Sequence, residues 1–162
     1  MTKSVRSVLV FGLIVAALTL IADQATKYLV LHDPRLEVGE RIAVTPFFDL
    51  VLAMNKGISY GLFPQHGEIG RWILVMVNLA ATGLFIFWLM RAGDRLLAAA
   101  VGFLIGGALG NALDRALYGA VVDFALLHWG EWRWYVFNIA DAAIVAGVIG
   151  LLYDAFLARA SK

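Results

Sequence analysis

The hydrophobic positions of the chain gather in four long stretches, at about residues 7–31, 72–90, 96–117 and 137–157. A helix that crosses a bilayer needs about 20 mostly apolar residues, and each stretch meets this length. The pattern predicts a membrane all-α fold with four transmembrane helices. The second stretch is predicted to be apolar throughout. Trp72 and Trp88 lie roughly 24 Å apart along it, the spacing of two interfacial anchors, although two buried core tryptophans would give the same pattern.

Two longer segments separate these helices, at about residues 32–71 and 118–136. In the first, residues 35–52 partly alternate between polar and apolar and are rich in β-branched and aromatic side chains, which is typical of short strands. Pro46 argues against a central strand there. We expect a small β-sheet in this first segment, lying on the outer membrane face. The second segment contains aromatic side chains suited to the headgroup layer, at Trp129, Trp132, Trp134 and Tyr135.

The basic residues indicate how the chain is oriented. They flank the helices in three clusters: Lys3 with Arg6, Arg91 with Arg95, and Arg159 with Lys162. A chain that spans four times places all three clusters on one side, so both termini are predicted to be cytoplasmic. A cleaved signal peptide is the alternative for the first stretch, but the apolar run continues through Asp23 and Lys27 without a clear cleavage site.

Composition supports one membrane-embedded domain over residues 1–162. The chain is 62% hydrophobic and 15% charged, whereas soluble domains are about half apolar and a quarter charged. The net charge of +1, without a basic stripe, gives no indication of a nucleic-acid partner. There is no cysteine, which excludes a cysteine nucleophile and thiolate metal ligands. The three histidines are far apart in sequence, so no metal site and no cofactor are expected.

Four acidic residues are predicted to converge at the outer interface: Asp23, Asp114, Asp123 and Asp141. A charge at the centre of a membrane helix costs about 2.5–3.5 kcal/mol, so such residues are functional candidates. Asp23 and Lys27 are spaced i, i+4, as an ion pair on one helix face.

Helical spacing also groups Asn111, Asp114 and Arg115 on one face, and Asn138 with Asp141 on another. Polar contacts that only hold helices together are the alternative for Asp23, Lys27, Asp114 and Arg115. For the remaining two acids this alternative is weaker, because neither has a basic neighbour in the sequence.

Two unpaired carboxylates in one place suggest a shared proton, at Asp123 and Asp141. Such a pair cannot ionise fully, so one member stays protonated while the other can accept a proton from water. This is the arrangement of an aspartic peptidase, and it needs no metal. A site at the membrane surface also gives access to water.

A short motif favours a different chemistry. Residues 57–61 match G-x-S-x-G, in which Ser59 would be a nucleophile. The motif requires a nearby base, for which the sequence offers Lys56 and His128. Glycines that permit a sharp turn or a close approach to a peptide explain the same residues.

Four sequence blocks, in order, resemble the motifs of the lipoprotein signal peptidase (signal peptidase II) family. They are DQATK at 23–27, NKGISYGLF at 55–63, GGALGNALDR at 106–115 continued by GAVVDF at 119–124, and FNIAD at 137–141. Together they span most of the chain.

The resemblance implies a bacterial inner-membrane aspartic endopeptidase, with its active site at the periplasmic face. It would remove signal peptides from prolipoproteins by cutting before a diacylglyceryl-modified cysteine. Prolipoproteins and membrane lipids would be its partners, and the chain would act as a monomer without a cofactor. Asp123 and Asp141 would be the catalytic pair. Substrate-binding or supporting roles fall to Asp23, Lys27, Asn55, Gly57, Asn111, Asp114, Arg115, Asn138 and Ala140.

A small proton- or ion-coupled transporter is the rival hypothesis, because buried acids also mark ion paths. The acids of this chain cluster at one face, however, and the second helix and the inner part of the third carry no charge. A conduction path across the membrane is therefore hard to draw.

Overall fold

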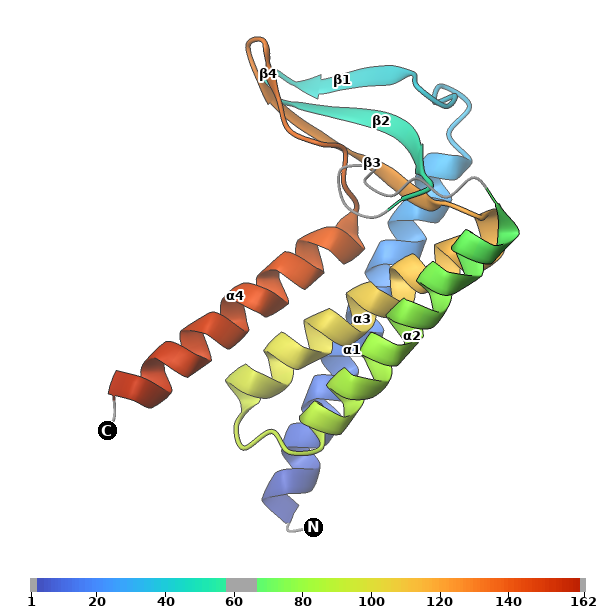
Figure 1. Cartoon of the computed structure of the whole chain (residues 1–162). Coiled ribbons are helices and arrows are strands. Elements are labelled where there is room, and N and C mark those ends of the chain that lie inside the picture. The colour runs from blue at the N-terminus through green and yellow to red at the C-terminus, as the bar shows by residue number, and fades with distance from the viewer. Residues whose placement is uncertain (1–2, 58–66, 161–162) are drawn as a thin grey trace.

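The computed structural model describes residues 3–57 and 67–160, and these form four helices and four strands. In chain order they are α1 (Lys3–Leu31), β1 (Arg41–Thr45), β2 (Phe48–Asn55), α2 (Glu68–Leu89), α3 (Arg95–Tyr118), β3 (Val121–Trp129), β4 (Trp132–Arg133) and α4 (Ile139–Ala160). The helices run beside one another, and the sheet lies across one end of the bundle, away from both termini (Figure 1). Apart from Gly57, the Ser59 motif lies outside the described residues.

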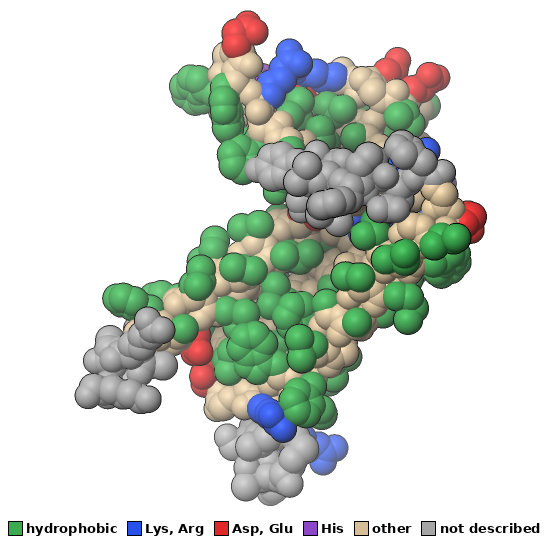
Figure 2. Space-filling model, viewed as in Figure 1, with side chains coloured by type: hydrophobic (Ala, Val, Ile, Leu, Met, Phe, Trp, Pro, Cys, Tyr) green, Lys and Arg blue, Asp and Glu red, His purple; other side chains and the backbone are tan. Residues whose placement is uncertain are grey.

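All four helices are long and apolar enough to cross a membrane, which confirms the predicted fold class. Their spanning parts are Arg6–Leu31, Glu68–Leu89, Arg95–Tyr118 and Ile139–Phe156. The central helix is α3, because 67% of its most apolar part is buried inside the protein, against 17–28% for the others. The outward surfaces of the other helices carry large apolar side chains, such as Leu18, Leu84 and Leu152, that are more than 60% exposed. Apolar side chains cover this part of the surface in Figure 2, as a lipid environment requires.

Small residues allow α3 to lie close to its neighbours. A Cβ atom at Gly106 would lie 2.6 Å from the carbonyl oxygen of Ala16 in α1. One at Gly107 would lie 2.6 Å from the carbonyl oxygen of Ala140 in α4. In a membrane, where apolar burial does not drive helices together, such close backbone packing provides much of the association energy.

The carboxyl-terminal end of α3 is fixed by contacts that also direct the chain into the sheet. Arg71 of α2 donates hydrogen bonds to the carbonyl oxygens of Arg115 (2.8 Å) and Ala116 (2.6 Å) in the last turn of the helix, and the Arg115 oxygen also accepts from the backbone N–H of Gly119. Gly119 ends the helix with φ 75°, a left-handed conformation that favours glycine. The chain then enters β3 at Val121.

The sheet is antiparallel in the order β1-β2-β3-β4. The expected sheet is confirmed, but its assignment to the first outer segment alone is incomplete, since β3 and β4 come from the second. A small apolar core, which includes Val30 of α1, Leu52 of β2 and Val122 of β3, joins the sheet to the end of α1. Pairing of β2 with β3 shifts register between Leu50 and Ala53.

Candidate active site

A pocket of about 160 Å³ opens where the helices meet the sheet. Its lining comes from both strands of the central pair, from α2, α3 and α4, and from the segment before α4: Asn55, Asn78, Asn111, Arg115, Val121, Asp123, Tyr135, Val136, Asp141 and Ile144. Both predicted catalytic aspartates are among them. Asp123 lies in β3, within the segment at 118–136 that separates the last two helices, and Asp141 lies in the first turn of α4.

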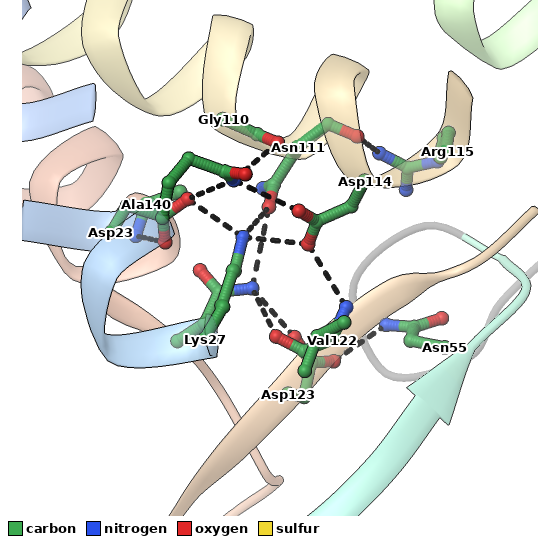
Figure 3. Close-up of polar contacts among 12 residues, drawn as sticks. Asp23, Lys27, Asn55, Gly110, Asn111, Asp114, Arg115, Val122, Asp123 and Ala140 are labelled. Carbon is green, nitrogen blue, oxygen red and sulfur yellow. Dashed lines mark hydrogen bonds and ion pairs between the residues drawn. The ribbon is translucent and has the colours of Figure 1, made fainter. Parts of the chain in front are cut away.

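A buried lysine organises the polar groups behind this pocket. The Nζ atom of Lys27 lies 2.8 Å from Oδ2 of Asp23 and 2.8 Å from Oδ2 of Asp114 (Figure 3). The side chains of all three are at most 2% exposed. The expected Asp23–Lys27 ion pair is therefore present, with a second carboxylate from α3. Removing a buried charge from water is costly, and a charge of the opposite sign on each side offsets much of that cost.

The remaining oxygens of these two acids hold neighbouring elements in place. Oδ1 of Asp23 accepts a hydrogen bond of 2.9 Å from the backbone N–H of Ala140, at the start of α4. Oδ2 of Asp114 accepts one of 3.0 Å from the backbone N–H of Val122, next to Asp123. The cluster thus fixes both backbone segments that carry the predicted catalytic pair.

Two asparagines connect the cluster to the catalytic candidates. Asn111 accepts a hydrogen bond from Lys27 (3.3 Å) and donates one of 2.9 Å to Oδ1 of Asp141. Asn138 donates to Oδ1 of Asp123 at 2.7 Å, and its own oxygen accepts from the backbone N–H of Asp141 at 2.9 Å. Asn138 therefore contacts the side chain of Asp123 and the backbone of Asp141. Lys27 and Asn138 both donate to Oδ1 of Asn111, which orients its amide.

The second strand of the sheet completes the surroundings of Asp123. Nδ2 of Asn55 donates to Oδ2 of Asp123 at 3.0 Å, while Oδ1 of Asn55 accepts from the backbone N–H of Gly57 at 2.9 Å. Arg115 donates to the carbonyl oxygen of Gly57 at 2.7 Å. Asn55, Gly57 and Arg115 therefore form one connected group at the pocket edge.

Burial and a neighbouring carboxylate perturb the pKa of Asp123, which lies outside the spanning segments. Desolvation, followed by the charge of Asp141, raises the pKa of Asp123 to about 7. Hydrogen bonds from Asn55 and Asn138 and the charge of Lys27 oppose this rise. Asp123 is therefore a carboxyl group that can hold a proton near neutral pH.

The structure brings together all eleven residues predicted for the site, and it adds one that the sequence did not reveal. Asn78 of α2 lines the pocket, so the prediction of an apolar second helix is wrong at this position. Its Nδ2 atom is buried and has no hydrogen-bond acceptor among the described residues. The amide of Asn78 within an apolar run was the available signal. The sequence alone does not show which side of this helix faces the other helices.

A second buried acid lies outside the pocket, in the sheet. Asp49 of β2 is fully buried and forms ion pairs with Arg41 of β1 and, at 3.2 Å, with His128 of β3. This group links three strands and is separate from the catalytic candidates. No group of three or more His, Asp and Glu side chains within residues 3–57 and 67–160 is arranged to hold a metal ion.

The family whose sequence pattern matches the chain is described as Signal peptidase (SPase) II, and the match covers residues 15–157. A lipoprotein signal peptidase of Methylorubrum extorquens (strain PA1) is 55% identical over 143 residues, which is 88% of this chain and 84% of that protein. The lipoprotein signal peptidase of Methylocella silvestris is 53% identical over 151 residues, which is 93% of this chain and 88% of that protein.

A solved structure gives the same picture of the fold. It is a bacterial membrane enzyme determined by the in meso method at 2.3 Å resolution, with a TM-score of 0.83 and 25% sequence identity. The match covers 93% of this chain and 90% of that one.

Proposed function

The chain belongs to the signal peptidase II family, and we propose that it hydrolyses the signal peptides of prolipoproteins with two aspartates, Asp123 and Asp141. The observation that carries the proposal is that one buried amide, Asn138, contacts both residues. Both carboxyl groups line one pocket, and the charge of Asp141 raises the pKa of Asp123, so we treat them as one coupled pair. The raised pKa of Asp123 favours Asp123 as the member that holds the proton near neutral pH.

The proposed reaction needs only these two groups and a water molecule. The ionised carboxylate of Asp141 removes a proton from the water as its oxygen attacks the scissile carbonyl carbon. The protonated Asp123 donates a hydrogen bond to the carbonyl oxygen, which becomes negatively charged. When the C–N bond breaks, Asp141 returns this proton to the amide nitrogen, which leaves as an amine, and the carbonyl carbon becomes the carboxyl group of the other product.

The supporting residues would hold this geometry in a partly apolar environment. Lys27 pairs with Asp23 and Asp114 and orients Asn111, while Asn55 and Arg115 bind the backbone of Gly57 at the pocket edge. Pre-organised groups of this kind lower the barrier because they need not rearrange during the reaction. Gly57 and Ala140 contribute through their backbone atoms.

The position of the pocket suits a substrate anchored in lipid. The pocket lies at the sheet end of the bundle, which we assign to the outer face of the bacterial inner membrane, with both termini in the cytoplasm. The acyl chains of a diacylglyceryl-modified cysteine would fix the depth of the scissile bond, which raises its effective concentration at the dyad. We expect the chain to act as a monomer among membrane lipids.

The test is cleavage of a diacylglyceryl-modified prolipoprotein by the purified protein in detergent. Asp123→Asn and Asp141→Asn are each expected to abolish cleavage while the protein stays folded. Asp33→Asn is the matched control, because Asp33 pairs with Arg35 in an exposed turn away from the pocket. Normal cleavage by either site variant would overturn the assignment of the dyad.

The family membership does not favour the transporter hypothesis, and neither does the arrangement of charge. The buried acids converge at one end of the bundle, where they pair with Lys27 or with asparagine amides.

A further inference from the structure

We infer that Asn78 binds the main chain of the substrate on the signal-peptide side of the scissile bond. The inference rests on the proposed function, because it assigns a second role within the same pocket. It starts from a group that the catalytic arrangement leaves unused. Nδ2 of Asn78 is a buried donor with no acceptor in the part of the chain that the structure describes.

An unpaired donor at this position is costly for the protein alone. Burying an amide without a hydrogen bond costs free energy, and within a membrane helix there is little water to relieve it. An alternative use would be a contact between helices, but Asn78 lines the pocket with Asn111 and Asp141. Its backbone carbonyl is used separately, as the acceptor for the hydroxyl of Thr82 at 2.8 Å. The side-chain amide is therefore free to face a ligand in the pocket.

The depth of Asn78 indicates which part of the substrate it meets. Asn78 lies ten residues into α2, which is about 15 Å below the outer end of that helix. Asp123 and Asn55, in contrast, are in the sheet above the helices. The pocket thus extends from the sheet toward the membrane interior. A signal peptide enters the bilayer on the amino-terminal side of the cut, so this segment would pass the deeper wall of the pocket.

The chemistry of that segment explains why a donor is needed. Attack on a peptide bond requires the chain to be extended around the bond, and an extended segment loses the internal hydrogen bonds of a helix. Its carbonyl oxygens then need donors, because unpaired backbone groups are costly in hydrocarbon. The Nδ2 group of Asn78 can satisfy one of these carbonyls. Since the contact is to the main chain, it fits substrates of different sequence.

The experiment compares Asn78→Leu, which removes the amide at similar size, with Asn78→Gln, which keeps it. Thr82→Val is the matched control, because Thr82 is a buried polar residue one turn along the same helix whose hydroxyl bonds within the helix. We expect Asn78→Leu to lower kcat/KM for prolipoprotein roughly 5- to 100-fold, the effect of one hydrogen bond in a buried site. Asn78→Gln should recover part of the loss, and Thr82→Val should retain wild-type kcat/KM.

Product inhibition locates the contact, and stability separates binding from a structural role. Asn78→Leu should weaken inhibition by the released signal peptide by a similar factor and leave inhibition by a diacylglyceryl-cysteine peptide unchanged. Its thermal unfolding temperature in detergent should equal or exceed that of the wild type, because an unpaired buried amide has been removed.

Unchanged kcat/KM in Asn78→Leu would overturn the inference, as would a lower unfolding temperature that explains the loss. Either result leaves the aspartate dyad intact. Cleavage by Asp123→Asn and Asp141→Asn would instead overturn the proposed function, so the two failures are distinguishable.

Discussion

Removing the amide of Asn55 should extend activity to higher pH. Nδ2 of Asn55 donates a hydrogen bond of 3.0 Å to Oδ2 of Asp123, which favours the ionised form of Asp123 and lowers its pKa. Despite this contact, burial and the charge of Asp141 raise that pKa to about 7. Without Asn55, the pKa of Asp123 should rise further.

The size of the pKa shift follows from the strength of this hydrogen bond. A hydrogen bond to a charged group contributes about 1.5–3 kcal/mol, and one pKa unit corresponds to about 1.36 kcal/mol. Asn55→Ala is therefore expected to raise the pKa of Asp123 by about one to two units. Because Asp123 must hold a proton, activity is lost as pH rises through this pKa. The alkaline limb of the kcat/KM profile should move upward by the same amount, even though the maximal rate falls.

The assay is the pH profile of kcat/KM for a diacylglyceryl-modified prolipoprotein in detergent. Asn78→Ala is the matched control, since it removes an amide from the same pocket that makes no hydrogen bond to Asp123. It should change the affinity for substrate and leave the position of the limb unchanged. An alkaline limb that stays in place or moves to lower pH in Asn55→Ala would refute the assignment of the shared proton to Asp123.

Two further predictions concern packing and the sheet. Gly110→Ala would place a Cβ atom against Oδ2 of Asp23, so the cleavage rate should fall at least about tenfold and the free energy of unfolding by about 1–3 kcal/mol. Gly83→Ala is the control and should change neither quantity, because a Cβ atom there meets no atom within 4 Å. Equal activity of the two variants would contradict the reasoning. Asp49→Asn should lower the free energy of unfolding by about 1–3 kcal/mol, because the buried charge that pairs with Arg41 and His128 is lost, while Arg41 is exposed enough to reach water. Thermal unfolding in detergent measures this, with Glu131→Gln, an exposed residue between β3 and β4, as the control that should leave the unfolding temperature unchanged.

The helices and the polar cluster could be predicted because a membrane requires long apolar stretches, in which charged residues stand out. Charges are rare in apolar stretches of this length, so Asp23 and Lys27 are conspicuous, and helical spacing places them on one face. Their ion pair could therefore be foreseen. The role of Lys27 as the partner of Asp114 as well could not, because it depends on how α1 packs on α3.

The strands β3 and β4, from the segment at 118–136, could not be predicted in this way. Residues 121–129 read VVDFALLHW, a largely apolar run with an aromatic end. This composition suits the headgroup layer and a buried strand equally well. The segment forms a strand because it pairs with β2. That contact joins residues about 70 positions apart, so no local sequence pattern predicts it.

Asn55 meets Asp123 only because the sheet is irregular. Asp49 pairs with Leu126, and Asn55 pairs with Val121. Six steps along β2 are therefore matched by five along β3, so one extra residue is accommodated in β2. Side chains of a strand alternate between the two faces. In a regular strand, the six steps from Asp49 to Asn55 would place both side chains on the same face of the sheet. The five steps from Leu126 to Val121 in β3 lead instead to the opposite face, which is also the face of Asp123.

The register shift between Leu50 and Ala53 resolves this conflict, because the side chains after it point to the opposite face from the one that regular alternation would give. A bulge of this kind re-aims the side chains that follow it, and bulges are common beside active sites. It leaves Asp49 on one face, in its ion pairs with Arg41 and His128, and presents Asn55 to the pocket on the other. The sequence does not reveal it, because residues 50–53 are all apolar and show no break in alternation. One strand can thus support both a buried ionic link in the sheet and a hydrogen bond to Asp123.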